Sequence, residues 1–216
     1  MRYFNNQRCE EFRSFFKGKQ AVAFTMDNVL VHTMETLQKW YASMYGEEFT
    51  LAQYADAGHN YHKLWDVTPE QAKEIIETFH FAVQLTIPAF PDAVVNMAAI
   101  RNHIARLMVV SARFPRLLSV TQGTVHRLFP ETFEEVRLCN GKSSSSKATA
   151  CAALGCYVLV EESLSEAIRV VEEDDAMRVI LLQGHRTQNL MVDKLPERII
   201  LAKDWSEITS LLTSVT

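Results

Sequence analysis

Short apolar segments alternate with helix-like segments along most of the chain, and this pattern constrains the fold more than any other feature. The clearest strand patterns cover residues 107–111, 156–160 and 178–182, and a segment with helical periodicity precedes or follows each of them. Strands that alternate with helices are joined by right-handed crossovers, which give a mostly parallel sheet covered on both faces. We therefore expect an α/β protein with a Rossmann-like core.

The remaining elements follow from the same periodicities. Residues 21–26 form a compact apolar run that breaks at Asp27, and they predict a first buried strand. Further short strands are expected near 136–139 and 199–201. The pattern predicts helices over about 9–17, 92–105, 115–129, 145–154 and 163–173, and from Asp204.

The segment between Thr33 and Leu85 is different, because it is rich in aromatic residues at helical spacing and shows no strand alternation. Thr68 followed by Pro69 predicts a helix start, through an N-cap side chain and a first-turn proline. We interpret residues 33–87 as a helical cap inserted into a core of residues 1–32 and 88–216.

Composition limits the classes of function. The chain has 216 residues, of which 48% are hydrophobic, and this is enough for one core and a small subdomain. Its net charge of −4 gives no basic field for a nucleic-acid polymer, and no apolar stretch reaches membrane-spanning length, so neither partner is expected. The four cysteines form no CxxC pair or disulfide framework, and a reducing, cytoplasmic compartment is the expectation.

Polar residues gather where the predicted strands end. In doubly wound sheets, ligands bind beyond the carboxyl ends of the strands. Hydroxyl and lysine groups there would satisfy phosphoryl oxygens, and carboxylates would hold a hard divalent cation. The residues at these positions are Thr25, Asp27, Ser111, Arg113, Lys147, Glu161 and Glu162.

Four segments, in order, resemble the motifs of the haloacid dehalogenase superfamily of phosphohydrolases. Phe24-Thr-Met-Asp-Asn-Val-Leu30 is similar to the first motif, an apolar strand followed by D-x-D-G-x-L, and Val109-Val-Ser-Ala-Arg113 resembles the second motif in its T-A-R form. Lys147 and, fourteen residues later, the pair Glu161 and Glu162 resemble the third and fourth motifs. The nearest branch is that of the 5'(3')-deoxyribonucleotidases, in which a helical cap lies between the first two motifs.

The resemblance implies a role for each matching position. In the family the first aspartate attacks phosphorus, the second is acid and base, and magnesium is held by the first aspartate and an acid of the fourth motif. Thr25 then falls at the nucleophile and Asp27 at the acid and base. The remaining positions match phosphate binding by Ser111, Arg113 and Lys147, and metal binding by Asp27, Glu161 and Glu162. Apart from the resemblance, the side chains of His59, Tyr61, His62 and Trp65 in the predicted cap could line the crevice and stack on a base.

Thr25 is the main departure from the pattern. An alkyl hydroxyl needs a base to become nucleophilic, and a phosphothreonine ester hydrolyses far more slowly than an acyl phosphate. Loss of this carboxylate also weakens the expected magnesium site. Asn28 replaces the usual glycine, and asparagine tolerates the left-handed conformation that the loop requires.

Each site residue also has a plain structural alternative. Ser111 could be a strand-end cap, Arg113 a surface charge and Lys147 a solvated side chain. The two glutamates could complement an exposed helix N-terminus, and the cap aromatics could pack helices together.

We therefore carry three hypotheses about function. The first is a catalytically impaired relative that binds a phosphorylated small molecule, such as a nucleotide, or a protein partner. The second is an active magnesium-dependent phosphatase or nucleotidase with an altered mechanism. The third is a structural interaction protein with a vestigial crevice.

Overall fold

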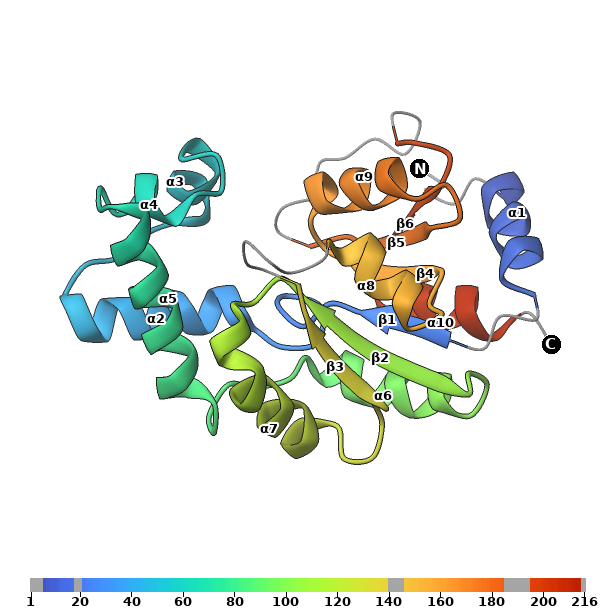
Figure 1. The fold of residues 1–216 in the computed structure, drawn as a ribbon, viewed down its shortest axis with the longest axis horizontal. Coiled ribbons are helices and arrows are strands. Elements are labelled where there is room, and N and C mark those ends of the chain that lie inside the picture. Colours follow the sequence, from blue (N-terminus) through green and yellow to red (C-terminus); the bar gives the residue numbers. More distant parts are fainter. Residues whose placement is uncertain (1–5, 18–20, 140–145, 185–194, 215–216) are drawn as a thin grey trace.

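A six-stranded parallel sheet with helices on both faces forms the body of the protein (Figure 1). The computed structural model describes residues 6–17, 21–139, 146–184 and 195–214. The strand order is β3-β2-β1-β4-β5-β6, and every neighbouring pair is parallel. The predicted α/β class is confirmed. The strands are β1 (Ala21–Phe24), β2 (Arg106–Ser111), β3 (Glu135–Leu138), β4 (Val158–Glu161), β5 (Arg178–Leu182) and β6 (Ile199–Ala202).

The order of the strands places a crevice at the carboxyl end of β1. The chain passes from β1 to β2 and β3 on one side, and then returns to β4 on the other side of β1. Connections that leave neighbouring strands in opposite directions open a gap above the sheet, and ligands bind in such gaps. The ends of β1, β2 and β4 are therefore the positions to inspect for a site.

Alternate side chains of the strands point to opposite faces of the sheet, as strand geometry requires. In β1, Val22 and Phe24 belong to one hydrophobic cluster, and Ala21 and Ala23 belong to the other. The first cluster is covered by α1 (Asn6–Phe16), α6 (Pro91–Arg101), α7 (Leu118–Leu128) and α10 (Trp205–Thr213), and the second by α8 (Lys147–Ala153) and α9 (Leu164–Glu173).

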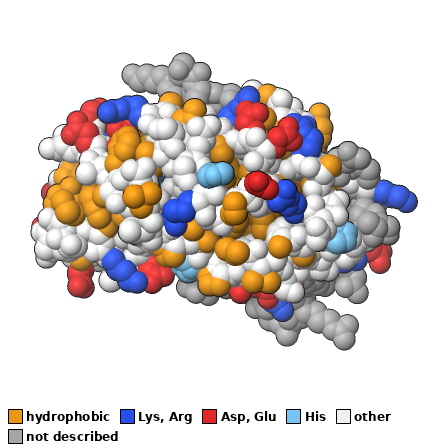
Figure 2. All heavy atoms as spheres, turned by 90° about the horizontal axis from the view of Figure 1, so that it is seen from below, with side chains coloured by type: hydrophobic (Ala, Val, Ile, Leu, Met, Phe, Trp, Pro, Cys, Tyr) orange, Lys and Arg blue, Asp and Glu red, His pale blue; other side chains and the backbone are white. Residues whose placement is uncertain are grey.

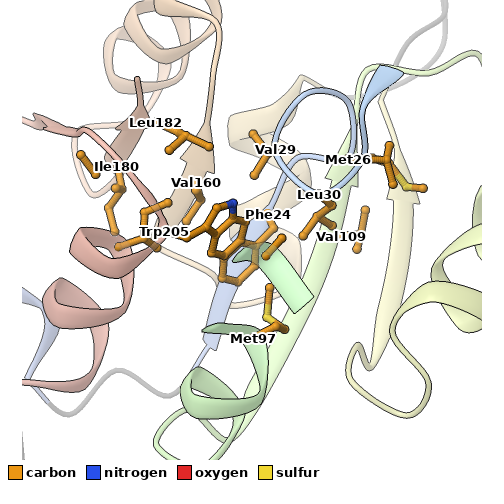
Figure 3. Close-up of a cluster of buried hydrophobic side chains, with 14 of the residues drawn as sticks. Phe24, Met26, Val29, Leu30, Met97, Val109, Val160, Ile180, Leu182 and Trp205 are labelled. Carbon is orange, nitrogen blue, oxygen red and sulfur yellow. The ribbon is translucent and has the colours of Figure 1, made fainter. Parts of the chain in front are cut away.

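Phe24 lies at the centre of the first cluster (Figure 3). Its ring stacks on Trp205, with ring centroids 5.9 Å apart and planes at 10°. Trp205 is held at the start of α10 by Asp204, whose side chain accepts a hydrogen bond from the N–H of Glu207 at 3.0 Å. This contact fixes the last helix against the first strand.

Four of the five helices between β1 and β2 lie to one side of the sheet (Figure 1). We call them the cap helices: α2 (Thr33–Tyr45), α3 (Leu51–Asp56), α4 (Tyr61–Leu64) and α5 (Pro69–Val83). The predicted start of α5 is confirmed, since Thr68 is the N-cap, Pro69 is the first helical residue, and Thr68 and Gln71 form a reciprocal capping box. The division into a core of 1–32 and 88–216 and a cap of 33–87 stays a prediction.

Some element ends differ from the sequence-based expectation. The helix expected over 115–129 begins as a short 3-10 helix, η1 (Pro115–Leu117), and continues as α7. The helix expected to reach 105 ends at Arg101, because the N–H groups of Asn102 and His103 bond to carbonyls of the last turn and the chain turns into β2. In the serine tract, Ser146 caps α8, and the other serines lie outside the described residues.

Within the described segments, no helix is long and apolar enough to cross a membrane.

Replacement of Phe24 by alanine tests the role of this core contact. We expect Phe24→Ala to lower the free energy of unfolding by about 3–5 kcal/mol, because a buried ring is lost and leaves a cavity beside Trp205. The midpoint of urea unfolding measures the change. Leu85→Ala is the control, since Leu85 is 76% exposed, and it should change stability by about 0.5 kcal/mol or less. Equal effects of the two variants would contradict this account of the core.

Candidate functional site

The ends of β1, β2 and β4 and the cap helices enclose a cleft of about 720 Å³. Ten residues singled out from the sequence line it together, although they come from segments far apart in the chain. Seven come from the strand ends and α8, two come from α4, and one comes from the loop between α3 and α4. They are Thr25, Asp27, Ser111, Arg113, Lys147, Glu161 and Glu162, with His59, Tyr61 and His62.

Thr25 follows β1 directly and presents a buried hydroxyl to the cleft. Its N–H donates to the carbonyl of Val160 in β4 at 3.0 Å, which holds the residue between the two strands. Its side chain is buried, and its Oγ1 has no hydrogen-bond partner among the described residues. Buried polar atoms in folded proteins are normally paired with protein, water or ligand. Within the described structure, the hydroxyl is therefore an unpaired polar group in the floor of the cleft.

The loop after Thr25 takes the shape that asparagine permits. Asn28 has a φ of 58°, in the left-handed region, as the sequence predicted. Its Oδ1 also accepts a hydrogen bond from the N–H of Met34 at 2.9 Å, in the first turn of α2. The substitution for glycine therefore keeps the loop and ties it to the first cap helix.

Asp27 and Arg113 form a double-sided ion pair across the cleft floor. The Arg113 Nη2 lies 2.6 Å from Asp27 Oδ1, and its Nε lies 3.0 Å from Oδ2. The Nη1 of Arg113 donates to the hydroxyl of Thr121 at 3.3 Å. The alternative of a surface charge is wrong for Arg113, because the residue is 5% exposed. Its guanidinium is committed to protein oxygens.

The ion pair keeps Asp27 ionised. Burial alone would raise the pKa of Asp27, but the charge and hydrogen bonds of Arg113 outweigh it and hold the pKa well below its ordinary value. Thr33 lowers the pKa further by donating its hydroxyl at 2.5 Å. A carboxylate with a strongly lowered pKa accepts a proton poorly, since efficient proton transfer requires a pKa near the working pH. Asp27 is therefore a weak base for the activation of Thr25.

His80 belongs to the cleft but was not singled out from the sequence. It lies on α5, is 5% exposed and lines the cleft beside Asp27 and Arg113. Burial, followed by the charge of Arg113, lowers the pKa of His80 to about 3, so the imidazole is neutral at pH 7. The only sequence signal is its place on the buried face of α5, at helical spacing from Ile76 and Val83.

Lys147 begins α8 and is also buried, so the alternative of a solvated side chain is wrong. Its Nζ lies 2.6 Å from Glu161 Oε2 and 3.6 Å from Glu166 Oε2. Burial would lower the pKa of Lys147, but the two carboxylates outweigh burial and raise it. The ammonium therefore stays charged on the cleft floor.

Glu161 is occupied on both carboxylate oxygens. While Oε2 accepts from Lys147, Oε1 accepts from the N–H groups of Glu162 and Ser163 at 2.8 and 2.9 Å. Glu162 is also buried and packs against Gly184, where an added Cβ would lie 3.2 Å from its Oε1. Glu161 therefore complements the backbone N–H groups before α9, but neither glutamate lies at an exposed helix terminus.

These residues do not fit a resident magnesium ion. Magnesium requires near-octahedral oxygen ligands that usually include one or two carboxylates. The carboxylate oxygens of Asp27 accept hydrogen bonds from Arg113, and those of Glu161 accept from Lys147 and backbone N–H groups. Thr25 has only a neutral hydroxyl. In the part of the chain that the structure describes, no group of three or more His, Cys, Asp or Glu side chains could hold a metal ion.

Trp65 does not belong to the cleft, in contrast to the expectation from the sequence. Its indole stacks between Tyr41 and Tyr61, with ring centroids at 4.7 and 4.9 Å. The residue therefore packs cap helices together, which is the structural alternative. Tyr61 takes part in the same stack and also borders the cleft.

Solved structures with the same fold are haloacid dehalogenase-type phosphatases and hydrolases. A protein assigned as a phosphoglycolate phosphatase from Lactobacillus delbrueckii subsp. bulgaricus has a TM-score of 0.66 and 16% identity, and the match covers 91% of this chain and 99% of that one. CbbY from Rhodobacter sphaeroides, in complex with xylulose-(1,5)bisphosphate, has a TM-score of 0.61 and 16% identity, and the match covers 87% of this chain and 95% of that one. A HAD family hydrolase from Deinococcus radiodurans R1, with bound phosphate and sodium, has a TM-score of 0.61 and 17% identity, and the match covers 91% of this chain and 96% of that one.

At this identity the likeness shows the fold alone. No protein-family model and no curated protein sequence matches the chain.

Removal of Arg113 tests the ion pair. We expect Arg113→Met to lower the free energy of unfolding by about 2–3 kcal/mol at pH 7, somewhat less than for a fully buried pair because the Asp27 side chain is 29% exposed. A carboxyl with a lowered folded-state pKa stabilises the protein above its unfolded-state pKa, and this contribution is lost as the pH falls. The difference between the native chain and the variant should therefore shrink below about pH 4. Urea unfolding at pH 7 and in acid measures both values.

Arg169→Met is the matched control, because Arg169 makes an exposed ion pair with Glu166. We expect it to lose about 0.5 kcal/mol, with no comparable change in acid. An Arg113→Met variant as stable as this control at pH 7 would contradict the account of Asp27.

Proposed function

We propose that this chain is a haloacid dehalogenase-like protein that binds a phosphorylated small molecule but is impaired in hydrolysing it. The observation that carries the proposal is the buried Thr25 hydroxyl, which has no partner among the described residues and lies at the floor of the cleft. It stands at the position that matches the nucleophile. A hydroxyl there can bond to a phosphoryl group, but it cannot replace the chemistry of a carboxylate.

The cleft floor offers groups suited to phosphoryl oxygens. Thr25 and Ser111 supply hydroxyls, and Lys147 supplies a buried ammonium. Charged donors make short, strong hydrogen bonds to phosphate oxygens. Two proteins of the same fold support this reading, since one holds phosphate and the other a sugar bisphosphate.

Hydrolysis should be impaired at two steps. Asp27 is a weak base because Arg113 lowers its pKa, so activation of Thr25 is unfavourable. A phosphothreonine, if formed, would be a phosphate monoester, which hydrolyses very slowly without help. Magnesium binding should be weakened as well, because the carboxylates of the floor already have partners.

Three further expectations belong to the same proposal. The resemblance to deoxyribonucleotidases favours a nucleotide as the ligand. The chain would divide into a core of 1–32 and 88–216 and a cap of 33–87. The compartment would be a reducing, cytoplasmic one, and Cys9, Cys139, Cys151 and Cys156 are all free thiols.

Restoring a carboxylate at residue 25 tests the impairment. We expect Thr25→Asp to gain magnesium-dependent release of phosphate from a nucleoside monophosphate or p-nitrophenyl phosphate, by about tenfold or more over the native chain. Thr25→Asn is the matched control, because it has nearly the same shape as aspartate without the charge, and it should gain nothing. A colorimetric phosphate assay measures the rates. Robust turnover by the native chain would overturn the proposal in favour of an active phosphatase with an altered mechanism.

Binding is tested separately on the native chain. We expect inorganic phosphate and nucleoside monophosphates to bind in titration calorimetry, and Lys147→Met to weaken binding by about tenfold, as for loss of a charge-assisted hydrogen bond. Lys63→Met is the control, because Lys63 is exposed on α4 and does not line the cleft. Absence of binding by the native chain would favour a structural interaction protein.

A further inference from the structure

Charge is distributed unevenly around the cleft. The cap segment 33–87 carries eight Asp and Glu residues against three Lys residues, yet none of these acids lines the cleft. Red acidic side chains are instead visible on the outer surface at the cap end of the molecule, on the left in Figure 2. All four acids of the cleft come from the core. The part of the cap that lines the cleft therefore carries no Asp or Glu side chain.

Lys73 is the lysine that the cap contributes to the lining of the cleft. It lies on α5, and its Nζ lies 5.1 Å from the centroid of the Phe114 ring, in the loop that follows Arg113. Both residues line the cleft. An ammonium over an aromatic face is attracted to it by a cation–π interaction, and this places Lys73 at the edge of the cleft, with its side chain 48% exposed.

A nearby carboxylate does not cancel the charge of Lys73. Glu77, one turn further along α5, lies 3.9 Å from the Lys73 Nζ but 3.1 Å from Nη1 of Arg116. Arg116 therefore balances the buried Glu77, and the group of three keeps one positive charge beside the cleft. The other two cations that line the cleft, Arg113 and Lys147, each have a carboxylate oxygen at 2.6 Å.

The floor does not supply a long-range attraction for an anion. It holds four carboxylates, Asp27, Glu161, Glu162 and Glu166, against the two cations Arg113 and Lys147, and remains negative when Arg169, which pairs with Glu166 from outside the cleft, is included. A cleft draws in ligands of the sign opposite to its own field. Attraction for an anionic ligand must therefore come from the cap side.

We propose that the ligand carries a second anionic group, a carboxylate or a second phosphate, at the end opposite its phosphoryl group, and that Lys73 binds it. This inference rests on the proposed function, because it takes the phosphoryl group to lie at the floor beside Thr25. The apolar side chains of Tyr54, Tyr61 and Ile76 line the cap side as well, and they would cover the carbon skeleton between the two charged ends. Lys73 is then a residue that determines ligand specificity.

Two matched pairs of phosphate esters test the inference. In each pair one compound ends in a carboxylate and the other in a hydroxymethyl group: 3-phosphoglycerate with glycerol 3-phosphate, and the longer 6-phosphogluconate with sorbitol 6-phosphate. Titration calorimetry gives Kd for each. We expect the compound with the carboxylate to bind about fivefold more tightly than its hydroxymethyl match in at least one pair, which is the ratio for one half-exposed ion pair.

The variant Lys73→Met should abolish this preference, because methionine keeps an apolar stem over Phe114 but carries no charge to distinguish the carboxylate from the hydroxymethyl group. Lys63→Met, on the outside of the cap, should keep the preference. If inorganic phosphate and the two hydroxymethyl esters bind but neither carboxylate is preferred, or if Lys73→Met keeps the preference, the inference is wrong and the proposed function stands. If inorganic phosphate and all four esters fail to bind, the proposed function itself fails.

Discussion

The ion pair between Asp27 and Arg113 is the interaction on which the rest of the site depends. It joins the loop after β1 to the loop after β2, through residues 86 positions apart in the chain. Once Arg113 is buried, its charge requires the ionised form of Asp27, and the same charge helps to keep His80 neutral. This contact thus fixes the charge of Asp27 and adds to the effect of burial on the pKa of His80.

The second pair, between Lys147 and Glu161, completes a floor whose charges are largely satisfied within the protein. Thr25 lies on this floor as the polar group whose hydroxyl lacks a partner in the described structure. Binding and hydrolysis make different demands on such a floor. Donors to phosphate need only position and charge, whereas a nucleophile needs a carboxylate or an available base. We propose that the arrangement meets the first demand and not the second, and the two are therefore tested separately.

Much of the fold could be predicted from the sequence, because it depends on local periodicity. The strand at 178–182 was predicted with its observed bounds, and the left-handed turn at Asn28 follows from the properties of that residue. The cleft residues were found because motifs at strand ends are local signals. Trp65 was misplaced, since an aromatic residue at helical spacing can face either a ligand or another helix, and only packing against Tyr41 and Tyr61 decides between them.

The sequence by itself determined the parallel α/β architecture, the helical character of the segment before Pro88 and the absence of a carboxylate at Thr25. Only the tertiary structure decided which charges meet, and so showed that Arg113 and Lys147 are buried and that His80 faces the site. The physical reason is that periodicity arises within a few residues of the chain. Burial and ion pairing arise between residues that are distant in sequence, and they set the charge state of a group only after the chain has folded.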